Sequence, residues 1–316
     1  MSEFTPKIVV VGSHAPGITV QVKRIPVAGE TVVGWNLEEA VDGGKGSNQS
    51  IAAARLGAPT GFVGCIGKDR RGAECERMLK AERIEISHLY KSDSVGSGAG
   101  IIILDEHGIP AMVTSLGANG DLTGQQVDSA LAAYRGAEVM LTQFEIPAEV
   151  ALHAARTARH YHMITIVNPA PAARIDLTDL AVADVLVPNQ AEAQLLLDVE
   201  PKRRFDLELA AQELRSLTGV GVVIITAGEQ GIFGADSEGV WSGLPPGVVV
   251  VDTSGAGDVF CAALAVGLTR RMHHRAASAF AGSAAALSVT KAGTIPSFPT
   301  SVELEEFNLS LGTPSA

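Results

Sequence analysis

Residues 252–258 read Asp-Thr-Ser-Gly-Ala-Gly-Asp, and an unbroken helical pattern follows over about residues 259–270. Small residues ahead of a helix leave several backbone N–H groups unpaired at one point, where the positive end of the helix dipole also favours an anion. Asp258 adds a carboxylate beside this anion hole. A carboxylate there suits a general base that takes a proton from a hydroxyl attacking a phosphoryl group. An ordinary capped helix with a Gly-rich entry explains the stretch equally well on its own.

The chain around this stretch alternates between helical and strand patterns from about Leu122 onward. Apolar runs predict strands at 138–142, 163–167, 185–187 and 222–226, and helices begin near 123, 147, 189 and 206. Two further helices are predicted at 257–270 and 274–290. This alternation predicts a central, mostly parallel sheet covered on both faces by helices, an α/β fold.

The first 115 residues have a different pattern. An apolar run at 7–12 predicts a buried strand, followed by a helix at 46–56, a strand at 61–66 and a helix at 69–82. Segments with one wet face are predicted at 18–22, 31–38, 98–104 and 111–115. We therefore expect a single α/β domain over residues 1–316, into which a small lid sheet formed by about 17–40 and 96–116 is inserted.

Composition and charge limit the partners of the chain. Its 316 residues suffice for one large domain, and a net charge of −11 argues against nucleic acid or a membrane surface as a general partner. No apolar stretch approaches the roughly 20 residues that span a bilayer. The sparse cysteines Cys65, Cys75 and Cys261 are typical of free thiols in a reducing compartment. We expect a cytoplasmic protein that binds small molecules.

A second glycine-rich motif lies at residues 43–48, Gly-Gly-Lys-Gly-Ser-Asn, at a predicted helix entrance. The glycines allow the backbone to approach a ligand closely, and Lys45 and Asn48 offer donors there. The spacing matches neither a Walker A loop nor a dinucleotide-binding fingerprint. A tight helix N-terminus without a ligand is the alternative.

Polar residues also follow the predicted strands of the sheet. Asn189 and Glu192 open a helix after the strand at 185–187, with the spacing of a capping box and equally that of a pair organising Mg²⁺ and phosphates. Residues 226–231, Thr-Ala-Gly-Glu-Gln-Gly, permit a backbone turn beside a nucleotide. Glu145 and Asn168 lie at carboxyl ends of strands, where open α/β sheets bind ligands, although either could cap a helix.

Taken in order, these motifs resemble the ribokinase-like (PfkB) family of carbohydrate kinases, in its ribokinase form, over nearly the whole chain. The resemblance rests on the stretches 43–49 and 52–57, Asn-Pro-Ala-Pro-Ala at 168–172, Pro-Asn-Gln-Ala-Glu at 188–192, residues 252–258, and Ala-Leu-Ser-Val-Thr-Lys-Ala-Gly at 286–293. Each stretch by itself is a weak signal, and the resemblance depends on their joint order and spacing.

The resemblance implies ATP-dependent phosphorylation of a sugar hydroxymethyl group, with Mg²⁺. It implies that Asp258 is the general base and that the backbone of Gly255, Ala256 and Gly257 forms the anion hole. The implied nucleotide-binding residues are Asn189, Glu192, Thr226, Gly228 and Gly231. The implied sugar-binding residues are Gly43, Gly44, Lys45, Asn48 and Glu145, together with Asp258.

The resemblance also implies a monovalent-cation site, with potassium as an activator. Its matching positions, acting mostly through main-chain carbonyls, are Asp252, Ser254, Ser288, Lys291, Gly293 and Ser297. In this family the small sheet closes over the sugar and often pairs with a second subunit, so we expect a homodimer.

One departure from the family pattern concerns the sugar. Family members of the ribokinase form typically continue the first strand with Gly-Ser-x-Asn-x-Asp, but here Ala15 and Gly17 replace the Asn and the Asp. His14 is a candidate substitute, and a structural role for it is equally open. D-ribose is the best single candidate substrate, and another pentose, a polyol or a nucleoside is the alternative. A non-catalytic sensor is disfavoured by the retained Asp258.

Overall fold

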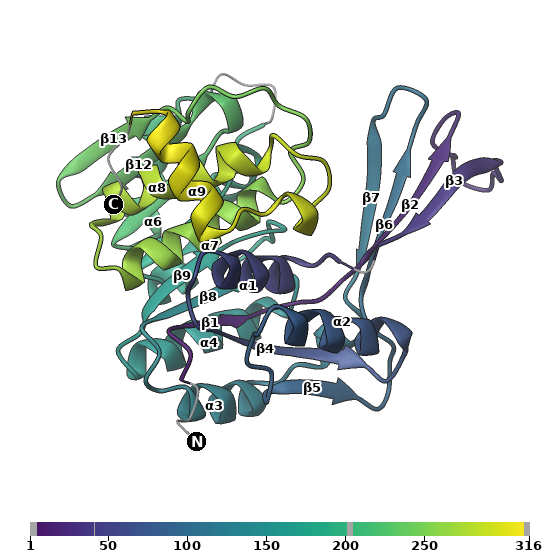
Figure 1. Cartoon of the computed structure of the whole chain (residues 1–316), viewed down its shortest axis with the longest axis horizontal. Coiled ribbons are helices and arrows are strands. Elements are labelled where there is room, and N and C mark those ends of the chain that lie inside the picture. Colours follow the sequence, from purple (N-terminus) through teal and green to yellow (C-terminus); the bar gives the residue numbers. More distant parts are fainter. Residues whose placement is uncertain (1–4, 41, 201–204, 313–316) are drawn as a thin grey trace.

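The computed structural model of the chain describes residues 5–40, 42–200 and 205–312. Within these ranges a nine-stranded sheet forms the body, and a separate four-stranded sheet projects beside it (Figure 1). No helix in these ranges is long and apolar enough to span a bilayer.

The large sheet has the order β13-β12-β11-β10-β9-β8-β1-β4-β5. In this order, neighbouring strands from β11 through β10, β9, β8, β1 and β4 to β5 pair in parallel, and β12 and β13 add an antiparallel edge. The strands are β1 Ile8–Val11, β4 Thr60–Gly67, β5 Leu89–Ser92, β8 Val139–Gln143, β9 Ile164–Asn168, β10 Val185–Leu186, β11 Val222–Thr226, β12 Ile232–Asp236 and β13 Gly239–Gly243. The predicted mostly parallel sheet is confirmed, whereas the β12–β13 edge and the short β5 were not predicted.

Helices cover both faces of this sheet, as predicted. Successive strand residues point to opposite faces, so Ile8 and Val10 pack into one apolar layer while Val9 and Val11 pack into the other. The first layer holds α1 Lys45–Arg55, α2 Arg70–Ala81, α7 Ala256–Thr269, α8 His274–Ser288 and α9 Ser301–Ser310. The second holds α3 Gly124–Ala133, α4 Ala148–His160, α5 Gln190–Leu196 and α6 Leu207–Thr218.

The order of the strands creates a switch point beside β1. The chain continues from β1 to β4 and β5 on one side, then returns to β8 on the other side of β1. In open α/β sheets the crevice at such a point, outside the carboxyl ends of the strands, binds ligands. The residues after β1, β8, β9, β10 and β11 meet at this edge, and these are the segments that the sequence singled out.

The small sheet contains β2 Gly17–Val22, β3 Gly34–Glu39, β6 Ala99–Leu104 and β7 Pro110–Ser115, in the order β3-β2-β6-β7. It corresponds to the predicted second sheet. Large apolar side chains on or beside its strands are exposed, among them Val33 at 88%, Leu37 at 72% and Met112 at 68%.

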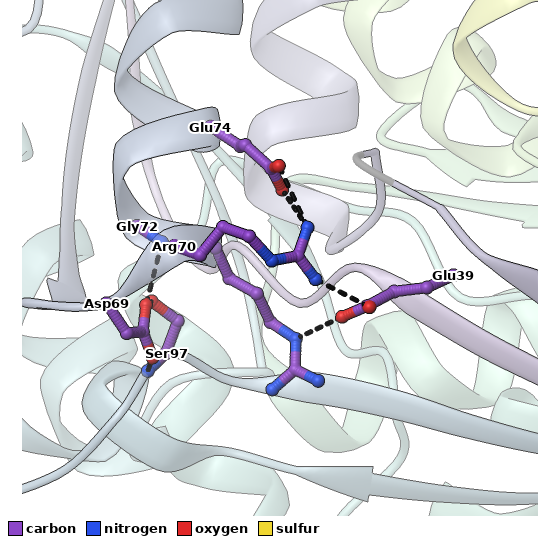
Figure 2. Close-up of polar contacts among 7 residues, drawn as sticks. Glu39, Asp69, Arg70, Gly72, Glu74 and Ser97 are labelled. Carbon is purple, nitrogen blue, oxygen red and sulfur yellow. Dashed lines mark hydrogen bonds and ion pairs between the residues drawn. The ribbon is translucent and has the colours of Figure 1, made fainter.

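The start of α2 ties the small sheet to the body (Figure 2). Arg70 and Arg71 form ion pairs with Glu39 at the end of β3, with N–O distances of 2.5 and 2.9 Å. One residue earlier, the Asp69 carboxylate caps α2 and accepts hydrogen bonds from the backbone N–H and the hydroxyl of Ser97, both at 2.7 Å. The end of β3 and the segment just before β6 are therefore both held at the N-terminus of α2.

Candidate active site

Asp258 lies in the first turn of α7, with only 7% of its surface exposed. Its Oδ2 accepts a hydrogen bond from Asn48 Nδ2 at 2.9 Å, and its Oδ1 accepts one from Gln49 Nε2 at 3.0 Å. Both donors are neutral amides on α1, and Asp258 forms no ion pair with any residue in the described ranges. The two amides thus hold the carboxylate in place without neutralising its charge, so it can still accept a hydrogen bond from a ligand.

The backbone before Asp258 forms a turn that only glycine fits. Gly255 is the N-cap of α7 with φ of 76°, and a Cβ there would lie 2.7 Å from the Phe298 ring. The Ala256 N–H donates to Thr253 O at 3.3 Å, whereas the N–H groups of Gly257 and Asp258 find no acceptor among the described residues. These two free donors and the helix dipole can hold an anion beside the carboxylate.

A pocket opens beside this turn. Its lining includes five residues that the sequence assigned to the sugar, the nucleotide or the anion hole, namely Lys45, Asn189, Glu192, Thr226 and Gly257. Asn168, Ala170, Val187 and Cys261 complete the lining. Burial opposes the charge on Lys45, but the carboxylates of Asp258, Glu145 and Glu192 outweigh it and raise the pKa of Lys45. A lysine that stays protonated here favours a polyanionic ligand.

Asn189 and Glu192 form the capping box that the sequence allowed. The Glu192 carboxylate accepts from Asn189 N at 2.8 Å, and Asn189 Oδ1 accepts from Glu192 N at 2.9 Å. Both residues also line the pocket, so the two interpretations are compatible. Burial, together with the charge of Asp258, raises the pKa of Glu192.

The remaining predicted nucleotide residues lie at the end of β11. Thr226 lines the pocket and neighbours Asn189 through a parallel bridge. Gly228 and Gly231 both have positive φ, at 56° and 94°, and a Cβ at Gly231 would strike the carbonyl oxygen of Gly243. The turn itself thus requires Gly231, and neither glycine lines the pocket.

At the N-terminus of α1, Glu145 joins three segments. Its Oε2 accepts from Ser13 Oγ at 2.6 Å and from the backbone N–H of Lys45 at 2.7 Å. Gly43 and Gly44 pass so close to the backbone of residues 14–16 that a Cβ at Gly43 would lie 2.5 Å from Ala15 O. Gly17, by contrast, has nothing closer than 3.7 Å to such an atom.

His14 and Asn48 are both buried polar residues at this end of β1 and α1. The His14 ring bonds to Ser47 Oγ at 3.2 Å, inside the protein, and its other nitrogen has no partner among the described residues. This geometry favours a structural role. Asn48 Oδ1 is likewise buried and unpartnered within those ranges, while its amide group donates to Asp258.

The predicted cation-site positions lie on two segments that the structure brings together. Val251 and Asp252 donate backbone N–H groups to Val289 O, and the Asp252 carboxylate accepts from Ser254 N and Gly293 N, both at 2.9 Å. The side chains of Ser288 and Ser297 donate to nearby carbonyls, and Lys291 pairs with Glu303 at 2.7 Å. Main-chain carbonyls are therefore the groups that this set can offer.

Comparison with known proteins agrees with this geometry. The model of the pfkB family of carbohydrate kinases matches residues 5–301. The chain belongs to the pfkB family. This pfkB protein is 36% identical to the ribokinase of Bacillus subtilis over 300 residues, which cover 95% of the chain and 98% of that protein.

Two further relatives extend the comparison. The chain is 33% identical over 295 residues to a bifunctional ribokinase/ribose-5-phosphate isomerase A of Fructilactobacillus sanfranciscensis, and it spans 54% of that protein's length. The ribokinase of Arabidopsis thaliana, solved in complex with ribose and ATP, superposes with a TM-score of 0.87 at 28% identity, covering 96% of this chain and 98% of that one. The ribokinase-like fold is thereby confirmed.

Sequence reasoning missed two buried amides in this site. Gln49 directly follows the glycine-rich motif at 43–48 and belongs to the quoted stretch 43–49, but nothing in that stretch showed that it contacts Asp258. Gln143 is the last residue of β8, and nothing in the sequence distinguishes it from an ordinary strand residue. Only the position of β8 beside β1 brings it to Gln49.

Proposed function

We propose that this pfkB protein transfers the γ-phosphoryl group of ATP to the hydroxymethyl group of a small sugar, and that D-ribose is the best single candidate. The observation that carries the proposal is a buried carboxylate, Asp258, beside the free N–H groups of Gly257 and Asp258. The likeness to ribokinases over almost the full chain supports it.

In this mechanism the sugar hydroxyl donates a hydrogen bond to the Asp258 carboxylate. As the oxygen attacks phosphorus, its proton passes to Asp258, the bond to the β-phosphate oxygen breaks, and ADP leaves. The N–H groups at the start of α7 and the ammonium group of Lys45 stabilise the negative charge on the transferring group. A positioned base of this kind supplies about 10²–10⁴-fold in rate.

The donor set near Glu192 fits a magnesium ion held mainly by phosphates. The described residues contain no group of three His, Cys, Asp or Glu side chains that could form a complete cage. Mg²⁺ commonly keeps several waters and binds one or two carboxylates plus substrate phosphates. Glu192 and Asn189 would hold such an ion, which would neutralise phosphate charge when bound.

Sugar binding would involve the buried Asn48 Oδ1, which has no partner in the part of the chain that the structure describes and can accept a hydrogen bond from a hydroxyl. Lys45, Glu145 and the backbone of Gly43 and Gly44 would contribute as well. Ala15 and Gly17 cannot supply the amide and carboxylate that the family pattern places there. Another pentose, a polyol or a nucleoside is therefore the second candidate substrate.

The decisive experiment measures ADP release with Mg²⁺, potassium and a panel of pentoses, hexoses, polyols and nucleosides. We expect turnover with at least one sugar, and a loss of about 10²–10⁴-fold in kcat in Asp258→Asn with ATP binding retained. No ADP release with any acceptor, or full activity of Asp258→Asn, would refute the kinase proposal. Turnover with a nucleoside alone would select the second candidate.

Potassium activation is part of the proposal. Asp252 lies just before the anion hole in the chain, and its carboxylate accepts a hydrogen bond from Gly293 N. A cation held by the main-chain carbonyls of these two segments would therefore add positive charge near the phosphates. Replacing potassium by tetramethylammonium should lower kcat, and equal activity in both salts would count against this site.

The small sheet would act as a lid over the sugar and as the contact between two subunits. Its exposed apolar side chains, including Val33, Leu37 and Met112, support this role. Sedimentation equilibrium should give twice the chain mass of 32.7 kDa, and Leu37→Glu should shift it toward the monomer. A monomeric wild type would refute the dimer.

A further inference from the structure

The structure contains a chain of buried amides that ends on Asp258. Gln143 Nε2 donates to Gln49 Oε1, and Gln49 Nε2 donates to Asp258 Oδ1 at 3.0 Å and to Asn168 Oδ1 at 3.3 Å. Gln49 and Gln143 are fully buried. We propose that Gln143 and Gln49 are positioning residues, which fix the orientation of the Asp258 carboxylate for proton transfer. This inference rests on the proposed function, because it assigns them to the same base.

The direction of the chain follows from the chemistry of its ends. An ionised carboxylate can only accept hydrogen bonds, so Gln49 must present its NH₂ group to Asp258. The carbonyl of Gln49 then faces β8, where Gln143 must in turn present its own NH₂ group. Turning either amide over would place two oxygens against each other at buried positions, which is costly.

Gln143 is held in this orientation although one of its own atoms is left without a partner. Its Oε1 is buried and has no hydrogen-bond donor among the described residues. The same oxygen lies against Gly12, where even a single Cβ would collide with it. A buried acceptor without a donor calls for a physical explanation. Here that explanation is the donor that Gln143 directs at Gln49.

Two amides suit a base better than a cation would in the same place. With Asn48 on Oδ2 and Gln49 on Oδ1, the plane of the carboxylate is fixed from the α1 side. Neither donor carries a charge, so the carboxylate is oriented while its ability to take the substrate proton is kept. Asn168, which also contacts Gln49, donates its own NH₂ group to Val187 O at 2.8 Å and so stays an acceptor for Gln49.

The test uses Gln143→Met, which removes the donor at nearly constant volume. The Gln49 amide is then free to rotate away from Asp258. We expect kcat to fall about 10- to 100-fold, the range for losing the hydrogen bond from Gln49 to the charged carboxylate. The KM for ATP should change by less than about 3-fold, because no nucleotide contact is altered. The melting temperature should fall little, since the unpartnered Oε1 is removed as well.

A double-mutant cycle separates positioning from general damage. In a Gln49→Met background, adding Gln143→Met should change kcat by less than about 3-fold, because Gln143 acts only through Gln49. Thr142→Val is the matched control. Its hydroxyl is buried and unpartnered within the described ranges on the same strand, and we expect it to keep wild-type kcat. If Gln143→Met does not fold, Gln143→Leu tests the same loss.

The outcomes distinguish this inference from the proposed function. Full kcat in Gln143→Met, or additive losses in the double variant, beside an inactive Asp258→Asn overturns the positioning role alone. A wild type inactive with every acceptor, or an active Asp258→Asn, overturns the kinase assignment and the positioning role with it.

Discussion

Replacing His14 by Asn should change how the stability of the protein depends on pH. Asn places a polar atom close to the position of Nδ1, so the contact with Ser47 can be kept, but it carries no titratable group. The His14 ring is 1% exposed, and burial lowers its pKa from 6.5 to about 4, although the charge of Asp69 acts in the opposite direction.

The size and sign of the effect follow from this shift. Below pH 6.5 the unfolded chain takes up a proton at His14, while the folded protein does not until the pH reaches about 4. The folded state therefore loses stability as the pH falls through this window. The interval from 6.5 to about 4 corresponds to about 3 kcal/mol.

The assay is urea unfolding of the wild type and His14→Asn at several pH values across that window. Carboxylates that titrate near pH 4 contribute equally to both proteins, so they cancel in the difference. We expect the variant to gain about 3 kcal/mol relative to the wild type between neutral pH and about pH 4. Parallel pH profiles for the two proteins would refute the buried, neutral ring.

Three further predictions concern other parts of the fold. Gly255→Ala should cost about 2–4 kcal/mol of folding stability and most of kcat, because φ is positive and the added Cβ would lie 2.7 Å from the Phe298 ring. Thermal melts and ADP release measure the two effects. Asp236→Asn should cost about 2–4 kcal/mol in urea unfolding, because Asp236 is buried and accepts from Arg275 and His274 at 2.7–2.8 Å. The control Glu238→Gln, which loses only an exposed contact with Arg275, should cost less than about 1 kcal/mol. Cys65, Cys75 and Cys261 are buried, which raises the pKa of each thiol, so Ellman's reagent should label none of them in the native protein and all of them in denaturant; rapid native labelling would contradict this burial.

The main architecture could be predicted because it depends on local patterns. Apolar runs such as 7–12 and 222–226 are long enough to define strands, and the helices between them set the parallel topology. The edge strands β5, β12 and β13 could not be predicted in this way. Leu-Tyr-Lys-Ser in β5 is short and half polar, and the Gly239–Gly243 strand is mostly exposed, so neither carries the pattern of a buried strand.

The residues of the candidate site also differ in whether they could be predicted from the sequence. Asp258 and its glycines are adjacent in sequence, so their local chemistry could be inferred from the stretch itself. The contact between Gln143 and Gln49 depends on which strands are neighbours, and one sequence does not show this. The sequence pattern alone could not decide between a capping role and a ligand-binding role for Asn189 and Glu192, because the same two residues both stabilise the helix and line the pocket.

The crowding at the end of β1 limits where acceptor preference can change during evolution or engineering. Gly43 and Gly44 lie against the backbone of residues 14–16, so larger side chains at either position would push the first strand out of register with the rest of the crevice. A Cβ at Gly17 would make only an ordinary contact, 3.7 Å from the side chain of Ile102, and Gly17 sits in β2 on the small sheet. A library aimed at new alcohols should therefore vary position 17 and leave the glycine pair untouched.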